Sequence, residues 1–227
     1  MATTDLSERP AKRLSAPATK RVLPGFGLSL GISLFFISLV LLLPISGLFI
    51  RAAGMGWEQF LFVITDPRVV ASYKVTALAA LAASLFNCVF GLLMAWVLVR
   101  YEFPGKRLLD AIMDLPFALP TAVAGITLAT LFAENGWYGQ YLAKLGIEVA
   151  FTPLGIVVAM AFTSVPFVVR TVQPVLEELA PEDEEAAMSL GASDMTVFRK
   201  ILFPTLWPAV VTGGALSFAR SLGEYGA

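Results

Sequence analysis

The chain has 227 residues, of which 57% are hydrophobic and 15% are charged, and its formal net charge is −1. This apolar share exceeds that of ordinary globular proteins, so part of the surface must face lipid. With no histidine and one cysteine, the sequence excludes histidine-based catalysis, the usual zinc sites and an intrachain disulfide. We therefore expect no catalytic residue and no metal site, and the missing basic stripe argues against nucleic acid as a partner.

The apolar residues gather in five uncharged stretches. Each is long enough for a helix to cross a hydrocarbon core of about 30 Å, which needs about 20 residues. The stretches cover residues 22–50, 75–99, 115–133, 149–169 and 201–219. They are continuous rather than alternating, which favours helices over the strands of a membrane barrel. The sequence predicts an all-α polytopic membrane protein, preceded by a disordered tail over residues 1–20.

Basic residues predict the orientation, because Lys and Arg near span ends stay in the cytoplasm. The N-terminal tail and the connection after the second stretch are the most basic segments. The expected cytoplasmic residues are Arg9, Lys12, Arg13, Lys20, Arg21, Arg100, Lys106, Arg107, Arg170, Arg199 and Lys200, against Arg51, Arg68, Lys74 and Lys144 outside. This asymmetry predicts a cytoplasmic N-terminus.

Several stretches contain residues that interrupt helices. They are Pro44, Pro116, Pro120, Pro166, Pro208, Gly213 and Gly214. A proline frees a carbonyl and kinks a helix, which lipid tolerates only where neighbouring helices or water satisfy the backbone. Broken helices near the middle of a membrane often line transport paths. Irregular packing is the alternative explanation, because Gly and Pro are common in membrane helices.

The loop 177–204, between the fourth and fifth stretches, has the pattern of two short helices. Pro181 suits a first turn, and the acidic residues 182–185 suit a helix N-terminus. Gly191 can end that helix in the left-handed conformation, and Ser193 can cap the next one. Adjacent Ala186 and Ala187 offer a surface that another protein can approach closely. A connector resting on the membrane is the alternative, but anionic lipid would repel its acidic turn.

The spacing of this loop resembles that of a known transporter family. Glu185, Ala186 and Ala187 are followed after three residues by Gly191, and later by Phe203 and Pro204. This resembles the EAA loop through which permease subunits of ABC importers contact their ATPases, although Phe203 stands where Leu is usual. Longer segments, among them FGLLMAWVLVRYEFPGKRLLDAIMDLPFALPTAVAG and LSFARSLGEYGA, resemble sulfate and thiosulfate permeases of the CysT or CysU type. Molybdate and tungstate permeases share much of the pattern, so molybdate or tungstate is the alternative substrate.

The resemblance implies a MetI-like transmembrane domain over residues 21–227, with residues 177–204 as the coupling loop. It also implies that the chain is C-terminally truncated, with five spans of an expected six. The implied location is the bacterial inner membrane. The implied partners are a second permease subunit, a dimer of ATP-binding subunits and a periplasmic sulfate- or thiosulfate-binding protein. The sequence has no GxxxxGK[ST] motif, so we expect ATP and Mg on the ATP-binding subunits and no cofactor on this chain.

Arg220 is the candidate for the anion path, because it lies about 24 Å along the fifth helix from Pro204. An ionisable residue at that depth usually faces a cavity or a partner. Glu224 is one turn away, and Ser217 and Ser221 are expected on the same face as hydroxyl donors. A purely structural ion pair is the alternative role.

A different class of protein, an ion-coupled secondary anion transporter, would also fit the broken helices, but it would not need the coupling loop. An intramembrane enzyme is disfavoured because Ser84 and Ser164 lack an activating partner.

Overall fold

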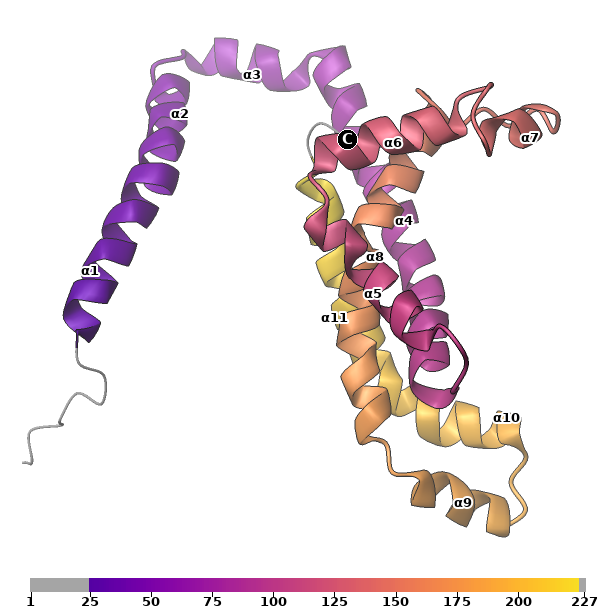
Figure 1. The fold of residues 1–227 in the computed structure, drawn as a ribbon. Helices are drawn as coiled ribbons and strands as arrows, with labels where there is room; N and C mark the ends of the chain where they lie inside the picture. Colours follow the sequence, from indigo (N-terminus) through magenta and orange to yellow (C-terminus); the bar gives the residue numbers. More distant parts are fainter. Residues whose placement is uncertain (1–24, 225–227) are drawn as a thin grey trace, which may run out of the picture. The chain divides into compact units, whose positions relative to one another are not determined.

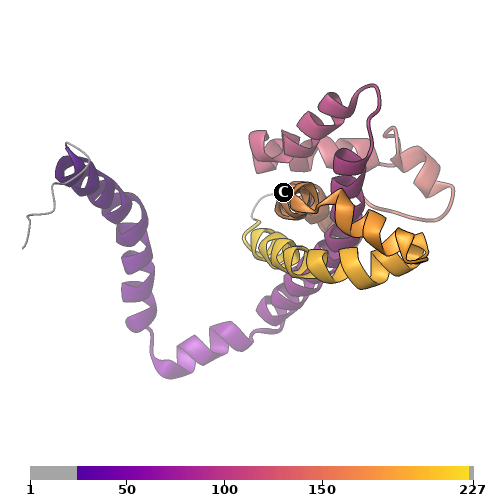
Figure 2. The same ribbon diagram turned by 90° about the horizontal axis from the view of Figure 1, so that it is seen from below.

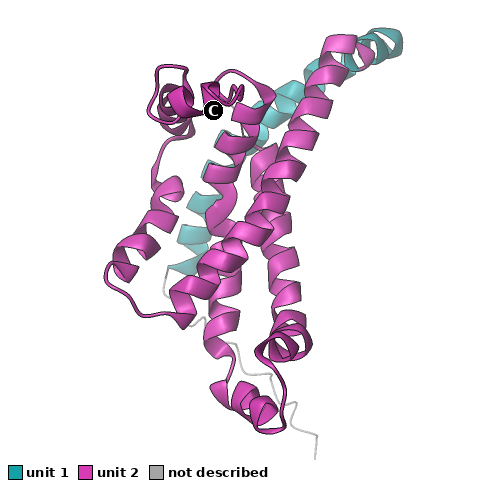
Figure 3. Ribbon diagram, turned by 90° about the vertical axis from the view of Figure 1, so that its right-hand side faces the viewer, with its two compact units in different colours: residues 1–64 teal, residues 65–227 magenta. Residues whose placement is uncertain are grey.

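The computed structural model describes residues 25–224, and these residues contain helices and no strands. The expected tail 1–20 lies outside the described residues. The chain divides into two compact units, residues 1–64 and 65–227 (Figure 3). The predicted all-α fold class is confirmed.

The first unit contains one long apolar helix that is interrupted by a π-helical turn. Helix α1 (Phe26–Ile37) continues through η1 (Ser38–Leu42) into α2 (Leu43–Ala53), and together they form a candidate membrane span of 28 residues. A wider turn before Pro44 fits the missing N–H and the bulk of the proline ring. Helix α3 (Trp57–Thr65) follows.

Three long helices form the core of the second unit, and we call them the three-helix core. They are α4 (Pro67–Arg100), α8 (Pro153–Glu178) and α11 (Phe203–Leu222) (Figure 1). Asp66 caps α4 by accepting a 2.8 Å hydrogen bond from the backbone N–H of Arg68. The buried centre consists largely of Val and Leu side chains, including Val168, Val169, Val172, Leu176 and Leu206.

Small residues let these helices approach closely. A Cβ atom on Gly91 of α4 would lie 2.7 Å from Cβ of Val168 on α8. A Cβ on Gly213 of α11 would lie 2.9 Å from Cα of the same valine, and one on Gly214 would lie 2.5 Å from Sγ of Cys88. Lipid removes most of the hydrophobic drive between helices, so their association depends on such close packing. Gly213 and Gly214 are therefore packing residues inside a continuous helix, and the expected interruption at these two positions is wrong.

A broken helix pair covers one side of the core. Helices α5 (Lys106–Ala118) and α6 (Thr121–Phe132) meet at 115° across Leu119 and Pro120. Proline at 120 removes a donor and keeps Leu119 in an extended conformation. The expected third stretch, 115–133, is therefore a bent pair rather than a straight helix. Helix α7 (Gly139–Ala143) follows α6.

Two short helices lie at the opposite end of this unit from α6 (Figures 1 and 2). Helix α9 (Pro181–Ser189) is followed by α10 (Asp194–Val197), which continues through the π-helical turn η2 (Phe198–Leu202) into α11. The second π-helical turn, like the first, stands two residues before a proline, here Pro204. The second short helix of the loop is therefore the start of the fifth span, and Arg199 and Lys200 lie inside the π-helical turn.

Among residues 25–224, four helices are long and apolar enough to cross a membrane. Counting the bent pair as one span gives five, the predicted number, and the approximate places of the spans agree with the prediction. Pro166 and Pro208, expected to interrupt their helices, lie inside α8 and α11, which continue past them.

Candidate functional site

The first candidate site is the loop built from α9, its following turn and α10. Pro181 occupies the first turn of α9, and Glu182, Asp183 and Glu184 place negative charge at its N-terminus, as predicted. Gly191 has a φ of +85°, the left-handed conformation predicted for it. The turn closes through a 3.1 Å bond from the Ala192 N–H to the Ala187 carbonyl oxygen. The helix–turn–helix shape of the loop is confirmed.

Ser193 occupies the N-cap position of α10, but its side chain accepts no backbone hydrogen bond. Its hydroxyl lies 2.9 Å from the hydroxyl of Thr196 instead. The backbone N–H of Thr196 donates to the Ser193 carbonyl oxygen over 2.8 Å. The predicted side-chain cap is therefore wrong, although the serine marks where the helix begins.

Helix α9 has an exposed face and a face turned toward the membrane helices. Glu185 and Ala186 are exposed, whereas Glu184 and Ala187 are half-buried. Leu190 beside the turn has 90% of its surface exposed. Helix α9 thus presents an acidic surface with small residues and an uncovered leucine at its end, and the predicted role of this surface as a docking element remains a prediction.

The half-buried face of α9 contacts the end of α4. The Arg100 guanidinium forms an ion pair with the Glu184 carboxylate and lies 5.5 Å from the centre of the Trp96 ring. The Trp96 ring in turn packs edge-on against Phe198 of η2, with centres 5.8 Å apart. Sequence patterns could not pair Arg100 with a residue 84 positions away.

A buried polar cluster joins the three helices of the core, near the middle of α8 and near the end of α11. The Ser164 hydroxyl on α8 lies 2.9 Å from Nδ2 of Asn87 on α4, and 3.0 and 3.1 Å from the hydroxyls of Ser217 and Ser221 on α11. All four side chains are buried, and Nδ2 of Asn87 also donates to the Ala161 carbonyl oxygen. Hydrogen bonds of this kind join helices in lipid. Ser217 and Ser221 therefore share a face of α11 that turns toward Ser164 and Asn87, and their predicted part in the anion path remains a prediction.

Arg220 and Glu224 form the ion pair that their spacing predicts. The Glu224 side chain is 3% exposed and the Arg220 side chain is 31% exposed. The hydroxyl of Thr163 on α8 lies 3.4 Å from the same carboxylate, and the second oxygen of Glu224 is buried with no hydrogen-bond partner. Arg220 thus keeps part of its side chain accessible while the carboxylate is enclosed.

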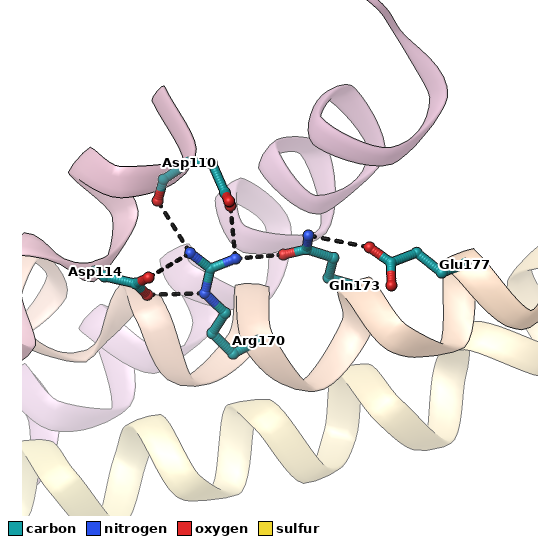
Figure 4. A network of polar contacts seen from close by, with 5 residues as sticks. All are labelled: Asp110, Asp114, Arg170, Gln173 and Glu177. Atoms are coloured by element: carbon teal, nitrogen blue, oxygen red, sulfur yellow. Dashed lines mark hydrogen bonds and ion pairs between the residues drawn. The ribbon is translucent and has the colours of Figure 1, made fainter. Parts of the chain in front are cut away.

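Arg170 is the centre of a polar network that sequence reasoning missed (Figure 4). Its Nε and Nη2 donate to both carboxylate oxygens of Asp114 over 2.8 and 2.7 Å. Its Nη1 donates to Asp110 Oδ1 and Gln173 Oε1, each over 2.6 Å, and Nη2 also donates to the Asp110 carbonyl oxygen over 3.0 Å. Gln173 donates to Glu177 over 3.2 Å. All five guanidinium N–H groups are therefore used, and they hold α5 against α8.

Two grooves adjoin these features. An apolar groove of about 550 Å³ lies between α6 and the start of α8, with Ile126, Phe132 and Ile156 in its wall. A polar groove of about 590 Å³ lies where α4, α5 and α8 come together, with Arg107, Asp110 and Gln173 in its wall. Residues 25–224 hold no group of three or more Cys, Asp or Glu side chains placed to bind a metal.

Comparisons with known proteins establish the family. Residues 87–227, which contain the coupling loop and the polar cluster, match the family described as binding-protein-dependent transport system inner membrane component. The chain belongs to this family. It is similar to the sulfate transport system permease protein CysT of Salmonella typhimurium and of Escherichia coli, each 66% identical over 212 residues. These alignments cover 93% of this chain and 76% of each relative.

The CysT permease protein of Synechocystis is 52% identical over 195 residues, or 86% of this chain and 68% of that protein. Family membership confirms the predicted class of inner membrane permease components and the all-helical fold. The chain is thus a transport component and not an enzyme by itself. The residues of the candidate sites lie within the matched region, and their individual roles remain predictions.

Proposed function

We propose that the chain is a permease subunit of an ATP-driven importer that moves sulfate or thiosulfate across the bacterial inner membrane. The observation that carries this proposal is the 66% identity, over 93% of the chain, to permease proteins named for sulfate transport. The coupling loop adds independent support, because an ion-coupled transporter has no need of a protruding element for an ATPase. The N-terminus lies in the cytoplasm, on the side where the basic residues gather.

The chain works with other subunits in this proposal. A second related permease subunit completes the path, and a dimer of ATP-binding subunits binds ATP and Mg. A periplasmic binding protein delivers sulfate or thiosulfate. Glu185 and Ala186 on the exposed face of α9, with the half-buried Ala187 beside them, contact the ATP-binding subunit, and Gly191 sets the direction of the chain that leaves the helix.

The chemistry of the anion suggests what the path requires. A tetrahedral dianion is held by several hydrogen-bond donors, and a guanidinium can offer two of them side by side. Arg220 supplies such a fork, and its pairing with Glu224 weakens the hold so that the anion can leave. Ser217 and Ser221 contribute by joining α11 to α8, a role that keeps Arg220 at a fixed depth.

The test is ATP hydrolysis by the reconstituted complex with sulfate, thiosulfate, molybdate and tungstate added in turn with the binding protein. We expect sulfate and thiosulfate to stimulate hydrolysis. Stimulation by molybdate and tungstate alone would assign the chain to that class of permease. Failure of the chain to retain an ATP-binding subunit in detergent would favour an ion-coupled transporter.

A further inference from the structure

The last residue of α4 lies against the first turn of α9. Arg100 and Glu184 form an ion pair in which their side chains are only 21% and 18% exposed. The same guanidinium lies over Trp96, and its Nε is buried without a hydrogen-bond partner. Arg100 is therefore confined between an acidic group on α9 and an aromatic ring on its own helix.

The pair is a direct side-chain link between α9 and the membrane helices. Among residues 25–224, no other ion pair joins α9 to another helix. The chain enters α9 through extended residues at Leu179 and Ala180 and leaves it through the left-handed turn at Gly191. These connections join α9 to α8 and to α10, so neither of them ties α9 directly to α4. A partly buried charge pair resists separation, because each charge left alone would lose its partner in a poorly hydrated place.

Glu184 also differs from the other acidic residues of this helix. Glu182, Asp183 and Glu185 are exposed and available to a partner protein, whereas Glu184 faces inward. Trp96, which supports Arg100, also contacts Phe198 at the start of the fifth span. A displacement of α9 therefore reaches α4 through the ion pair, and the start of the fifth span through the aromatic contact.

We propose that Arg100 is a positioning residue that, through Glu184, transmits movement of the coupling helix α9 to the membrane-spanning helix α4. This inference rests on the proposed function, since the movement comes from an ATP-binding subunit docked on the exposed face of α9. Arg100 does not contact that subunit or the transported anion. It determines how efficiently each cycle of ATP hydrolysis moves the helices that line the anion path.

The experiment measures sulfate uptake and ATP hydrolysis together, in proteoliposomes that contain the chain and its partner subunits. Arg100→Gln and Glu184→Gln should each retain the ATP-binding subunit and keep ATP hydrolysis, but sulfate taken up per ATP should fall about 5-fold or more, within the usual range of coupling factors. The double variant should be no worse than either single one, because both remove the same interaction. The exchange R100E with E184R should recover most of the lost ratio.

Glu102→Gln is the matched control. Glu102 is two residues beyond Arg100 and forms an ion pair with Lys106, but its side chain is 88% exposed, so this variant should keep the normal ratio. An unchanged ratio in Arg100→Gln would overturn the inference, as would additive losses in the double variant. If Arg100→Gln accumulates poorly in the membrane, the exchange R100E with E184R is the deciding variant. A failure of this exchange to recover the ratio of sulfate uptake to ATP hydrolysis would also overturn the inference. A complex with the unaltered chain that shows no ATP-driven uptake would instead overturn the proposed function.

Discussion

The choice of residue at Gly191 is restricted by the backbone conformation and not by neighbouring atoms. Its φ is +85°, and a Cβ atom placed there would meet no other atom within 4 Å. Asparagine adopts the left-handed conformation readily, whereas for a β-branched residue it costs roughly 1–3 kcal/mol. We expect Gly191→Asn to support normal uptake and Gly191→Val to lose both uptake and retention of the ATP-binding subunit. Equal behaviour of the two variants in co-purification and uptake assays would show that the left-handed turn is not required.

Arg220 and Glu224 test whether the ion pair at the end of α11 takes part in transport. Arg220→Lys keeps the charge but loses the two-pronged geometry, so we expect normal expression with reduced sulfate uptake. Arg220→Gln combined with Glu224→Gln removes both charges, so no unpaired charge is left enclosed at this position. The complex should therefore assemble but should not transport sulfate. Full sulfate uptake by this double variant would leave the pair with a structural role alone.

At the level of helices, the Arg170 network holds α5 against α8. Arg170→Gln would leave Asp110 and Asp114 facing each other one turn apart without a cation. The expected loss of stability is roughly 1–3 kcal/mol, because both carboxylates are partly exposed. Adding Asp110→Asn and Asp114→Asn should recover stability by removing the repulsion. Thermal unfolding in detergent measures the effect, with Arg107→Gln as control; a triple variant no more stable than Arg170→Gln would contradict this account.

The contact between α4 and α8 depends on the lack of a side chain at Gly91. Gly91→Ala places a methyl group 2.7 Å from both Cβ and Cγ1 of Val168, and overpacking of this kind costs about 1–3 kcal/mol. Removing two methyl groups with Val168→Ala in the same chain should recover part of that loss, although Val168→Ala alone should also destabilise the chain. Unfolding curves of the three variants form a double-mutant cycle. Simple additivity of the two losses would show that the helices do not meet at these residues.

Sequence reasoning found the helices better than it found the contacts between them. The apolar stretches gave the number and place of the spans, and the pattern around Gly191 gave the shape of the loop, because both depend on residues close together in the chain. The start of α4 at Pro67 was missed because its first turns are too polar for a hydrophobic stretch. The pairs Arg100–Glu184 and Arg170–Asp114 join residues 84 and 56 positions apart. Nothing local in the sequence specifies which charges meet across such distances.

In the whole molecule, the two candidate sites lie at different levels of the three-helix core, the first beside the last residue of α4 and the second beside Thr163 in the middle part of α8. The coupling loop adjoins the last residue of α4, and the pair Arg220–Glu224 lies at the last turn of α11. Coupling between such sites requires helices that move as units, and the close packing around Val168 favours this. In the proposed function, ATP binding beside α9 then changes access to the anion path beside Arg220.

ATP-dependent accumulation of radiolabelled sulfate tests this account most directly. The complex of the chain with its partner subunits is reconstituted in proteoliposomes loaded with ATP and Mg, with the binding protein and sulfate outside. We predict that sulfate accumulates against its gradient, that omission of internal ATP abolishes uptake, and that ionophores which collapse ion gradients have no effect. Uptake that persists without ATP and disappears with the ionophores would contradict the account and identify an ion-coupled transporter.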